Sequence, residues 1–294
     1  MVSPLPAQAK ALYPWQGNTL QVDGGALHYL DEGPKDAPVM LAVHGNPTWS
    51  FYWRALVSRF SGEFRVVVPD HIGCGMSDKP QDWDYRLEQH ISNLEKLVTH
   101  LDLQRVTLVV HDWGGAIGMG VAGRLSDRFE RLVVTNTAAF RSEQIPPSIA
   151  SCRIPGFGTL AVRGFNGFAW AASWRTTVRP LAPAVKQGLL APYDSWQNRI
   201  ATLRFVEDIP LKPQHPSYDT LLGVEDGLAK LVDLPMLICW GEQDWCFTPE
   251  FRKEWQRRFP QAEVEAWEDA SHYLIEDVPE RLLSRMEQFI ASAP

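Results

Sequence analysis

Three polar side chains in this sequence could act together as a nucleophile, an acid and a base. Asp112, Asp244 and His272 each closely follow an apolar run typical of a buried strand. In an open parallel sheet the carboxyl ends of the strands share one edge, where ligands bind. The chain order of nucleophile, acid and base matches the nucleophile-elbow arrangement. We therefore predict that Asp112 is a carboxylate nucleophile and that Asp244 orients His272, which handles a water or a proton.

The stretch around Asp112 has the pattern of a sharp turn from a strand into a helix. Residues 107–110 are a short β-branched run, and small residues from Gly114 onward favour a helix start. Gly114 and Gly115 would let two backbones pass closely, as a nucleophile elbow requires, with Asp where Ser is usual. The helix N-terminus should favour the charged carboxylate. The alternative is that Asp112 only caps the helix, a common role for Asp.

The choice of base and acid follows from position. His272 follows the last predicted strand, whereas other histidines lie beside tight turns, on a predicted helix or in a proline-rich loop: His44, His111, His90, His100 and His215. A histidine after a strand is often structural, so the partnership with two carboxylates is what favours a base. Glu143 is the rival to Asp244, but it lies several residues beyond the end of its strand.

Asn46 and Trp113 could complete the site as anion donors. Asn46 lies in the loop after an early strand and Trp113 follows the nucleophile, positions whose backbone N–H groups form an oxyanion hole. Their side chains add an amide donor and an indole donor without charge, which would suit a departing halide or carboxylate. The alternative is that Trp113 simply packs under a cap.

A carboxylate nucleophile narrows the chemistry. It is suited to displacement at saturated carbon, giving an alkyl ester whose own carbonyl is then opened by water that His272 activates. Alkyl halides, epoxides and strained lactones are the natural electrophiles.

Alternating strands and helices must position these groups. Continuous apolar runs predict buried strands, and apolar residues at helical spacing predict helices. The expected strands cover residues 39–43, 65–69, 107–110, 131–135, 235–240 and 262–268, after a hairpin at 21–30. The expected helices cover 50–60, 85–101, 114–124, 249–259 and a terminal segment from about 278. This alternation predicts an α/β fold with a mostly parallel central sheet and helices on both faces.

The alternation of strands and helices stops between residues 141 and 216, where prolines recur, aromatic residues are frequent and no strand is expected. We predict a helical cap domain at 141–216, inserted into a core domain made of 1–140 and 217–294. Residues 154–174 are nearly free of charge, but Arg163 and Asn166 would be costly in lipid. An apolar pocket lining is therefore favoured over a membrane span, with a surface-docking patch as the other alternative.

Composition argues against several functional classes. A net charge of -7 over 294 residues offers no basic footprint for nucleic acid. The four cysteines are far apart and suggest neither a disulfide framework nor a metal site, and Cys239 is expected in the core. The first residues lack the apolar segment of a signal peptide, so a cytoplasmic location is predicted. We expect no cofactor.

Three stretches resemble the haloalkane dehalogenase family of α/β-hydrolases, along nearly the whole chain outside the cap. They are His44-Gly-Asn-Pro-Thr-Trp-Ser-Phe-Tyr-Trp-Arg54, Asp70-His-Ile-Gly-Cys-Gly-Met-Ser-Asp-Lys-Pro80 and His111-Asp-Trp-Gly-Gly115. An acid after the strand past the cap, together with Asn46 as the halide-type donor, resembles the third subfamily. The resemblance implies an α/β-hydrolase fold with an inserted helical cap.

A narrower resemblance concerns the cap. Residues 198–210, Asn-Arg-Ile-Ala-Thr-Leu-Arg-Phe-Val-Glu-Asp-Ile-Pro, together with residues 70–75, look like the β-lactone decarboxylases of bacterial olefin biosynthesis. Those enzymes need no cofactor and convert cis-3,4-dialkyl β-lactones to cis-alkenes and carbon dioxide, beside a β-lactone synthetase and an NADPH-dependent reductase. The resemblance implies the same reaction, a small lipophilic substrate and these two partners.

Other functions stay open at this point. A haloalkane dehalogenase would use the same catalytic residues. An epoxide hydrolase would need cap tyrosines as ring-opening acids, for which Tyr193 and Tyr218 are the candidates, but Asn46 stands where that family commonly has an aromatic residue. A non-catalytic binding protein on the same fold is disfavoured by the complete set of Asp112, Asp244 and His272.

Overall fold

A central sheet of eight strands organises the computed structural model, which describes residues 5–292. The strands are β1 (Asn18–Val22), β2 (Gly25–Glu32), β3 (Val39–Val43), β4 (Arg65–Pro69), β5 (Val106–Asp112), β6 (Phe129–Thr137), β7 (Met236–Gly241) and β8 (Glu263–Trp267). Their spatial order is β1-β2-β4-β3-β5-β6-β7-β8. The hairpin and its neighbour, β1 to β2 and β2 to β4, pair antiparallel, and all other neighbours pair parallel. The predicted α/β fold with a mostly parallel sheet is confirmed.

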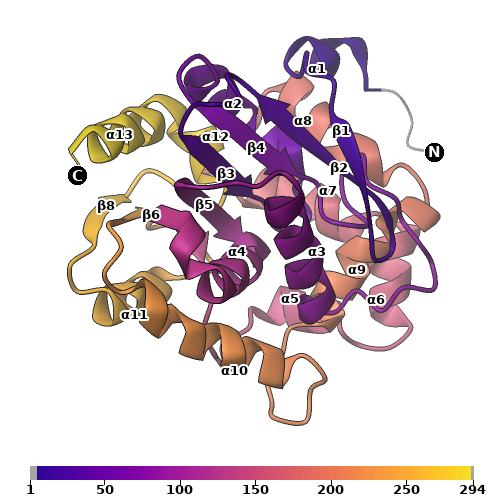
Figure 1. Cartoon of the computed structure of the whole chain (residues 1–294). Helices are drawn as coiled ribbons and strands as arrows, with labels where there is room; N and C mark the ends of the chain where they lie inside the picture. Colours follow the sequence, from indigo (N-terminus) through magenta and orange to yellow (C-terminus); the bar gives the residue numbers. More distant parts are fainter. Residues whose placement is uncertain (1–4, 293–294) are drawn as a thin grey trace.

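Helices cover both faces of this sheet (Figure 1). The α-helices are α1 (Ala7–Ala11), α2 (Arg54–Phe60), α3 (Leu87–His100), α4 (Trp113–Arg124), α5 (Pro147–Ser151), α6 (Phe157–Thr159), α7 (Gly167–Arg175), α8 (Pro183–Leu190), α9 (Ile200–Glu207), α10 (Tyr218–Gly227), α11 (Pro249–Arg258), α12 (Leu274–Asp277) and α13 (Pro279–Ser292). Shorter turns are η1 (Ser50–Trp53), η2 (Ser126–Arg128), η3 (Leu160–Gly164, a π-helix), η4 (Ala191–Tyr193), η5 (Gln197–Arg199) and η6 (Leu228–Leu231).

The two faces of the sheet have separate apolar cores because side chains alternate along each strand. In β3, Leu41 and Val43 join the cluster formed with α3, α4, α10 and α11, whereas Met40 and Ala42 join the cluster formed with α1, α2, α12 and α13. A strand that is buried on both faces must be apolar at every position. This is why the continuous runs predicted β3 and β4 with the observed bounds.

Two differences from the predicted elements matter for the site. β5 continues through His111 to Asp112, so the predicted nucleophile is the last residue of the strand. Helix α10 was not predicted, and its Leu221 and Val224 are buried against the core around α3 and α4. Its apolar face is short, so its helical periodicity is a weak signal in the sequence. Only the packing against neighbouring helices shows that this face is buried.

Residues 141–216, called the cap segment from here on, contain α5 to α9 and no strand within the described chain. These helices lie together beyond one edge of the sheet (Figure 1). The stretch 154–174 is broken into short pieces, and Asn166, with a φ of 55°, separates η3 from α7. No helix within residues 5–292 is long and apolar enough to cross a bilayer. That the cap segment is a separate domain stays a prediction.

Candidate active site

The turn at Asp112 is a strained strand-to-helix corner. Asp112 has a φ of 51° and a ψ of -128°, a conformation that is unfavourable for a residue with a side chain. A Cβ on Gly45 would overlap the Asp112 carboxylate, and a Cβ on Gly114 would overlap the Val43 carbonyl. Glycines are therefore required beside the corner so that the backbone can hold Asp112 at the sheet edge. The side chain of Asp112 makes no hydrogen bond as a helix cap.

The two oxygens of the Asp112 carboxylate have different surroundings. Oδ1 accepts the backbone N–H of Asn46 at 2.6 Å, and the carboxylate also accepts the backbone N–H of Trp113. Oδ2 lies 3.7 Å from Nε2 of His272, beyond hydrogen-bond distance. The two predicted oxyanion donors therefore contact the carboxylate itself. If Oδ2 attacks a substrate, Oδ1 becomes the ester carbonyl, and the Asn46 N–H stabilises charge that develops on it.

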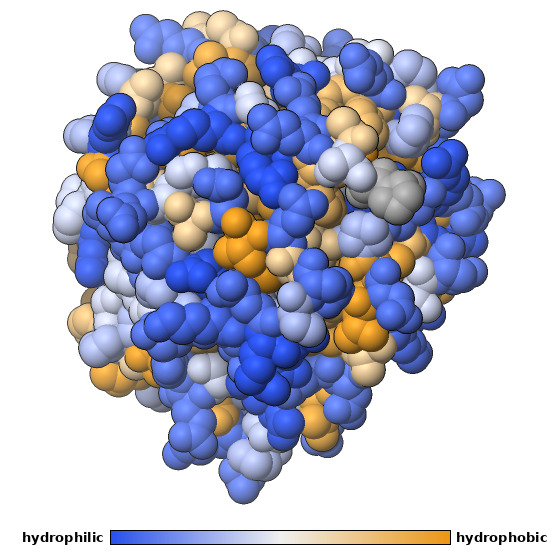
Figure 2. Space-filling model, turned by 90° about the vertical axis from the view of Figure 1, so that its left-hand side faces the viewer, coloured by the Kyte–Doolittle hydropathy of each residue, from blue (hydrophilic) through white to orange (hydrophobic). Residues whose placement is uncertain are grey.

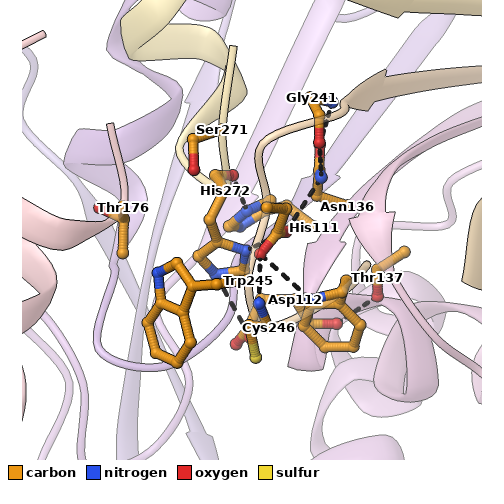
Figure 3. Close-up of polar contacts among 12 residues, drawn as sticks. His111, Asp112, Asn136, Thr137, Thr176, Gly241, Trp245, Cys246, Ser271 and His272 are labelled. Carbon is orange, nitrogen blue, oxygen red and sulfur yellow. Dashed lines mark hydrogen bonds and ion pairs between the residues drawn. The ribbon is translucent and has the colours of Figure 1, made fainter. Parts of the chain in front are cut away.

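His272 is fixed by a buried carboxylate. Its Nδ1–H donates to Oδ2 of Asp244 at 2.8 Å, and Asp244 is 3% exposed. The same Oδ2 accepts from Nδ2 of Asn136 at 2.9 Å, while Oδ1 accepts the backbone N–H groups of Cys246 and Phe247. Figure 3 shows these groups converging from separate segments. Because Asp244 accepts the hydrogen bond from Nδ1–H, Nε2 is the ring nitrogen that faces Asp112.

Asn136 is a site residue that sequence reasoning missed. It lies in β6 with a φ of 36°, and its side chain also accepts the backbone N–H of Gly241 at 2.9 Å. An Asn at a strand end that tolerates the left-handed region is a signal that could have identified it. It ties the end of β6 to the loop that carries Asp244.

The two histidines at the site are both buried, but their pKa values shift in opposite directions. Burial lowers the pKa of His111 well below its usual value, and the nearby His272 lowers it further. Burial also opposes the charge of His272, but the carboxylates of Asp244 and Asp112 outweigh it and raise the pKa of His272 above its usual value. His111 stays neutral and its Nε2–H donates to the His272 carbonyl at 2.8 Å.

The direction of the pKa shift of Asp112 differs from the sequence expectation. A helix N-terminus was expected to favour its ionised form. Burial instead raises the pKa of Asp112 above its usual value, because desolvation outweighs His272 and the N–H groups of Trp113 and Asn46. The result is a carboxylate with little hydration, which is a stronger nucleophile than one in water.

The side chains of Asn46 and Trp113 meet the cap segment. Nδ2 of Asn46 donates to the Thr202 carbonyl in α9 at 3.2 Å, and its Oδ1 is buried without a partner among the described residues. The Trp113 ring lies 5.3 Å from the ring of Phe205, also in α9. Trp113 therefore packs under the cap segment and also lines the site, so both predicted roles remain compatible with its position.

Two largely apolar chambers open at the Asp112 carboxylate. Chamber 1 encloses about 870 Å³ of space, including the part open to solvent, and is lined by Trp113 and by Leu87, Phe140, Val206, Leu221 and Phe251. Chamber 2 encloses about 900 Å³ on the same measure and is lined by His272 and by Phe157, Ala161, Ala171, Arg175 and Trp245.

The chambers share five lining residues: Asn46, Asp112, Ile149, Phe168 and Cys246. Asp112 is therefore at the junction of the two spaces. The donor Trp113 lines chamber 1 and the base candidate His272 lines chamber 2. A ligand with two apolar arms can place its centre at Asp112 and one arm in each chamber.

The rival site residues lie elsewhere. Glu143 is exposed and lines neither chamber. Tyr193 is fully buried with its hydroxyl donating to the Thr48 carbonyl, and Tyr218 is also absent from both linings. No cap tyrosine among the described residues faces Asp112, which weakens the epoxide hydrolase hypothesis. Within residues 5–292 no group of three or more His, Cys, Asp or Glu could hold a metal ion.

Several known proteins are similar to this chain in sequence and in architecture. Residues 38–187 match the family model of the alpha/beta hydrolase fold. The chain is 43% identical to the cis-3-alkyl-4-alkyloxetan-2-one decarboxylase of Shewanella oneidensis, over 95% of this chain and 89% of that protein. It is also 43% identical to the enzyme of the same name from Xanthomonas campestris, over 92% of this chain and 94% of that protein.

Haloalkane dehalogenases are more distant relatives. Haloalkane dehalogenase 2 of Mycobacterium bovis is 30% identical, over 92% of this chain and 93% of that protein. The crystal structure of the haloalkane dehalogenase DbeA from Bradyrhizobium elkani superimposes with a TM-score of 0.86 and 26% identity, covering 95% of this chain and 98% of that one. The chain therefore belongs to the α/β-hydrolase fold family, within the group that contains cis-3-alkyl-4-alkyloxetan-2-one decarboxylases and haloalkane dehalogenases.

Proposed function

We propose that this chain is a β-lactone decarboxylase that converts cis-3-alkyl-4-alkyloxetan-2-ones to cis-alkenes and carbon dioxide. The observation that carries the proposal is the junction of two apolar chambers at Asp112. A dialkyl β-lactone has two apolar tails on adjacent ring carbons, whereas a simple haloalkane has one chain. The 43% identity to two decarboxylases of this name supports the same substrate class.

The reaction can proceed without water. Oδ2 of Asp112 attacks the ring carbon that bears the oxygen, the carbon–oxygen bond breaks, and the ring oxygen leaves as part of a carboxylate. The bond to this carboxylate carbon then breaks, its electron pair forms the double bond, and Asp112 departs as a carboxylate with release of carbon dioxide. Inversion in the first step followed by anti elimination in the second turns a cis lactone into a cis alkene. No proton is gained or lost.

The site residues have matching roles in this route. The N–H group of Asn46 holds Oδ1, the N–H group of Trp113 also contacts the carboxylate, and Oδ2, which lies beside His272, makes the attack. The Asn46 amide lines the junction and the Trp113 indole lines chamber 1 beside it, where the ring carboxylate develops. When protonated, His272 stabilises Asp112 as a leaving carboxylate, and Asp244, whose charge helps to raise the pKa of His272, keeps this imidazolium in place.

A haloalkane dehalogenase is the second candidate, because the same geometry allows neutral His272 to activate water against an alkyl ester of Asp112. The two functions differ in water use. In the lactone route water would divert the ester to a β-hydroxy acid, so an apolar junction favours the alkene.

The test uses purified protein and a cis lactone with two alkyl tails. We expect alkene and carbon dioxide in equal amounts, measured by gas chromatography, and no product from the Asp112→Ala variant. Brominated and iodinated alkanes are assayed in parallel for halide release. Halide release without any alkene would assign the dehalogenase function instead, and a thermal shift with lactones but no turnover would indicate a binding protein.

The proposed function also bears on partners and location. We propose a cytoplasmic enzyme that receives its lactone from a β-lactone synthetase and works beside an NADPH-dependent reductase. All four cysteines are free thiols, as is typical of a reducing compartment. Co-purification with the synthetase from the native cell would support the association, and its repeated absence under gentle lysis would count against it.

A further inference from the structure

The surface of the cap segment differs in composition from the rest of the molecule. Residues 144–193 contain five basic side chains and no acidic one, in a chain whose net charge is -7. Among the described residues, eight of the ten exposed large hydrophobic side chains lie in the cap segment: Ile154, Phe157, Leu160, Phe165, Trp170, Trp174, Val178 and Trp196. These eight and the five basic residues define the cap surface. It combines apolar and positively charged groups without negative charge.

The cations of the cap surface lie beside tryptophans. Arg163 stacks on Trp196 at 4.7 Å, Lys186 lies 5.7 Å from the Trp170 ring, and Arg175 lies 6.0 Å from the Trp174 ring. Trp170 and Trp174, one turn apart on α7, contact each other. Within residues 5–292, none of the five cations, which also include Arg153 and Arg179, forms an ion pair with a carboxylate.

Exposed cations of the core behave differently. Arg59, Arg105, Arg257 and Arg281 each pair with a carboxylate at 2.6 to 2.7 Å. Figure 2 shows the side that carries α11 and α13, where hydrophilic residues dominate and hydrophobic ones form small separate groups. The positive charge of the cap surface is thus left available to an external anion, whereas that of these four core arginines is neutralised within the chain.

We propose that the cap surface docks on the face of an anionic phospholipid bilayer. Exposed Trp, Phe and Leu side chains with interspersed Arg and Lys are the composition of proteins that lie in the membrane interface, where aromatic rings enter the headgroup level and cations contact anionic lipids. The absence of acidic residues from 144–193 removes the repulsion that such a surface would otherwise exert.

Docking would place the entrance of the site against the lipid. Phe157 is 56% exposed and also lines chamber 2, as does the exposed Arg175. A long-chain lactone or alkene could then pass between bilayer and chamber without crossing water. This consequence rests on the proposed function, whereas the docking itself is measured without any substrate.

The experiment is co-sedimentation of the full chain with vesicles of phosphatidylcholine containing about 30% phosphatidylglycerol. We expect binding that weakens in high salt and on vesicles of phosphatidylcholine alone. The double variant Phe165→Ser/Trp170→Ser should bind at least about tenfold more weakly, since both side chains lose apolar burial. Neither residue lines a chamber, so turnover of a short-tailed lactone in detergent should be unchanged.

Matched variants come from the core surface. Val232→Ser removes an exposed apolar side chain there, and Arg257→Gln removes one positive charge as Arg179→Gln does in the cap surface. We expect Arg179→Gln to weaken binding and both core variants to leave it unchanged, with all variants matching the unmodified protein in circular dichroism. Absence of binding to anionic vesicles, or equal binding by the double variant, overturns the proposal. So does sedimentation velocity showing that the cap surface is covered by a second copy that the double variant releases.

Discussion

The two halves of the candidate site are built in contrasting ways. The core half holds Asp112, Asp244 and His272 in a buried network in which both oxygens of Asp244 are hydrogen-bonded, whereas Oδ2 of Asp112 and Nε2 of His272 face each other without a hydrogen bond between them. The cap half contributes apolar walls such as Ile149, Phe168 and Val206. Under the proposed function, we expect the core half to determine which bond is attacked and the apolar walls of the cap half to influence which molecule is admitted. Substitutions in the two halves should therefore differ in kind.

The largest effect is expected for Asp112→Asn. The amide keeps the shape of the side chain but cannot attack carbon, so alkene formation should fall by at least about a thousandfold for every tail length. Gas chromatography of alkene gives the rate, and thermal unfolding checks that the fold is kept. Substantial activity in this variant would exclude covalent catalysis by Asp112.

His272→Gln separates the two candidate reactions. Loss of the imidazolium should slow alkene formation by about a hundredfold, because a charge that stabilises Asp112 is removed but no proton transfer is lost. With an iodoalkane, the same variant should stop after one turnover and retain an alkyl ester on Asp112, visible as a mass increase of the intact protein. Equal arrest with both substrates would mean that the lactone reaction also needs water.

Substitutions in the chamber walls should alter tail preference. Ala171→Trp narrows chamber 2 and Ile209→Trp narrows chamber 1. Each should lower kcat/KM by about tenfold for lactones with a long tail at one ring position, and the two variants should affect opposite positions. Lactones with two short tails serve as the control. Equal losses for all tail patterns would show that the two chambers do not sort the tails.

The pH dependence probes the carboxylate. Asp112 must be ionised to attack, and burial raises its pKa above its usual value. We therefore expect kcat/KM to be maximal at higher pH and to fall as the pH drops through that raised pKa. His272, whose own pKa is raised, lowers the pKa of Asp112 when it is protonated. The acid limb should therefore move to higher pH in His272→Gln, and an unmoved limb would assign it to another group.

The smallest effect is expected for Asn136→Ala, which removes a side chain that supports the loop of Asp244 in the core half. Asn136→Ala leaves the backbone N–H of Gly241 and one oxygen of Asp244 without their partner, which should lower the free energy of unfolding by about 1–3 kcal/mol. Asn198→Ala, which removes an exposed hydrogen bond to Asp194, should cost less than about 0.5 kcal/mol. Urea unfolding measures both, and equal costs would mean that the network around Asp244 adds little.

The sequence alone was enough to predict the sheet and to select Asp112, Asp244 and His272, which the fold brings close together. Strands buried on both faces are continuous apolar runs, and the turn at Asp112 needs glycines whose spacing is visible without coordinates. Asp112 ends a strand of a parallel sheet, and Asp244 and His272 each follow one. The carboxyl ends of such strands lie at one edge, so the three residues are expected to lie near one another.

Tertiary structure alone decided the surroundings of these groups. The raised pKa of Asp112, the support by Asn136 and the meeting of two chambers all depend on residues distant in sequence, and desolvation has no local signature. The cap segment was the harder part because short, proline-interrupted helices have weak periodicity. Which of its apolar residues line a chamber, as Phe168 does, and which stay exposed, as Phe165 does, is set by packing between helices rather than by composition.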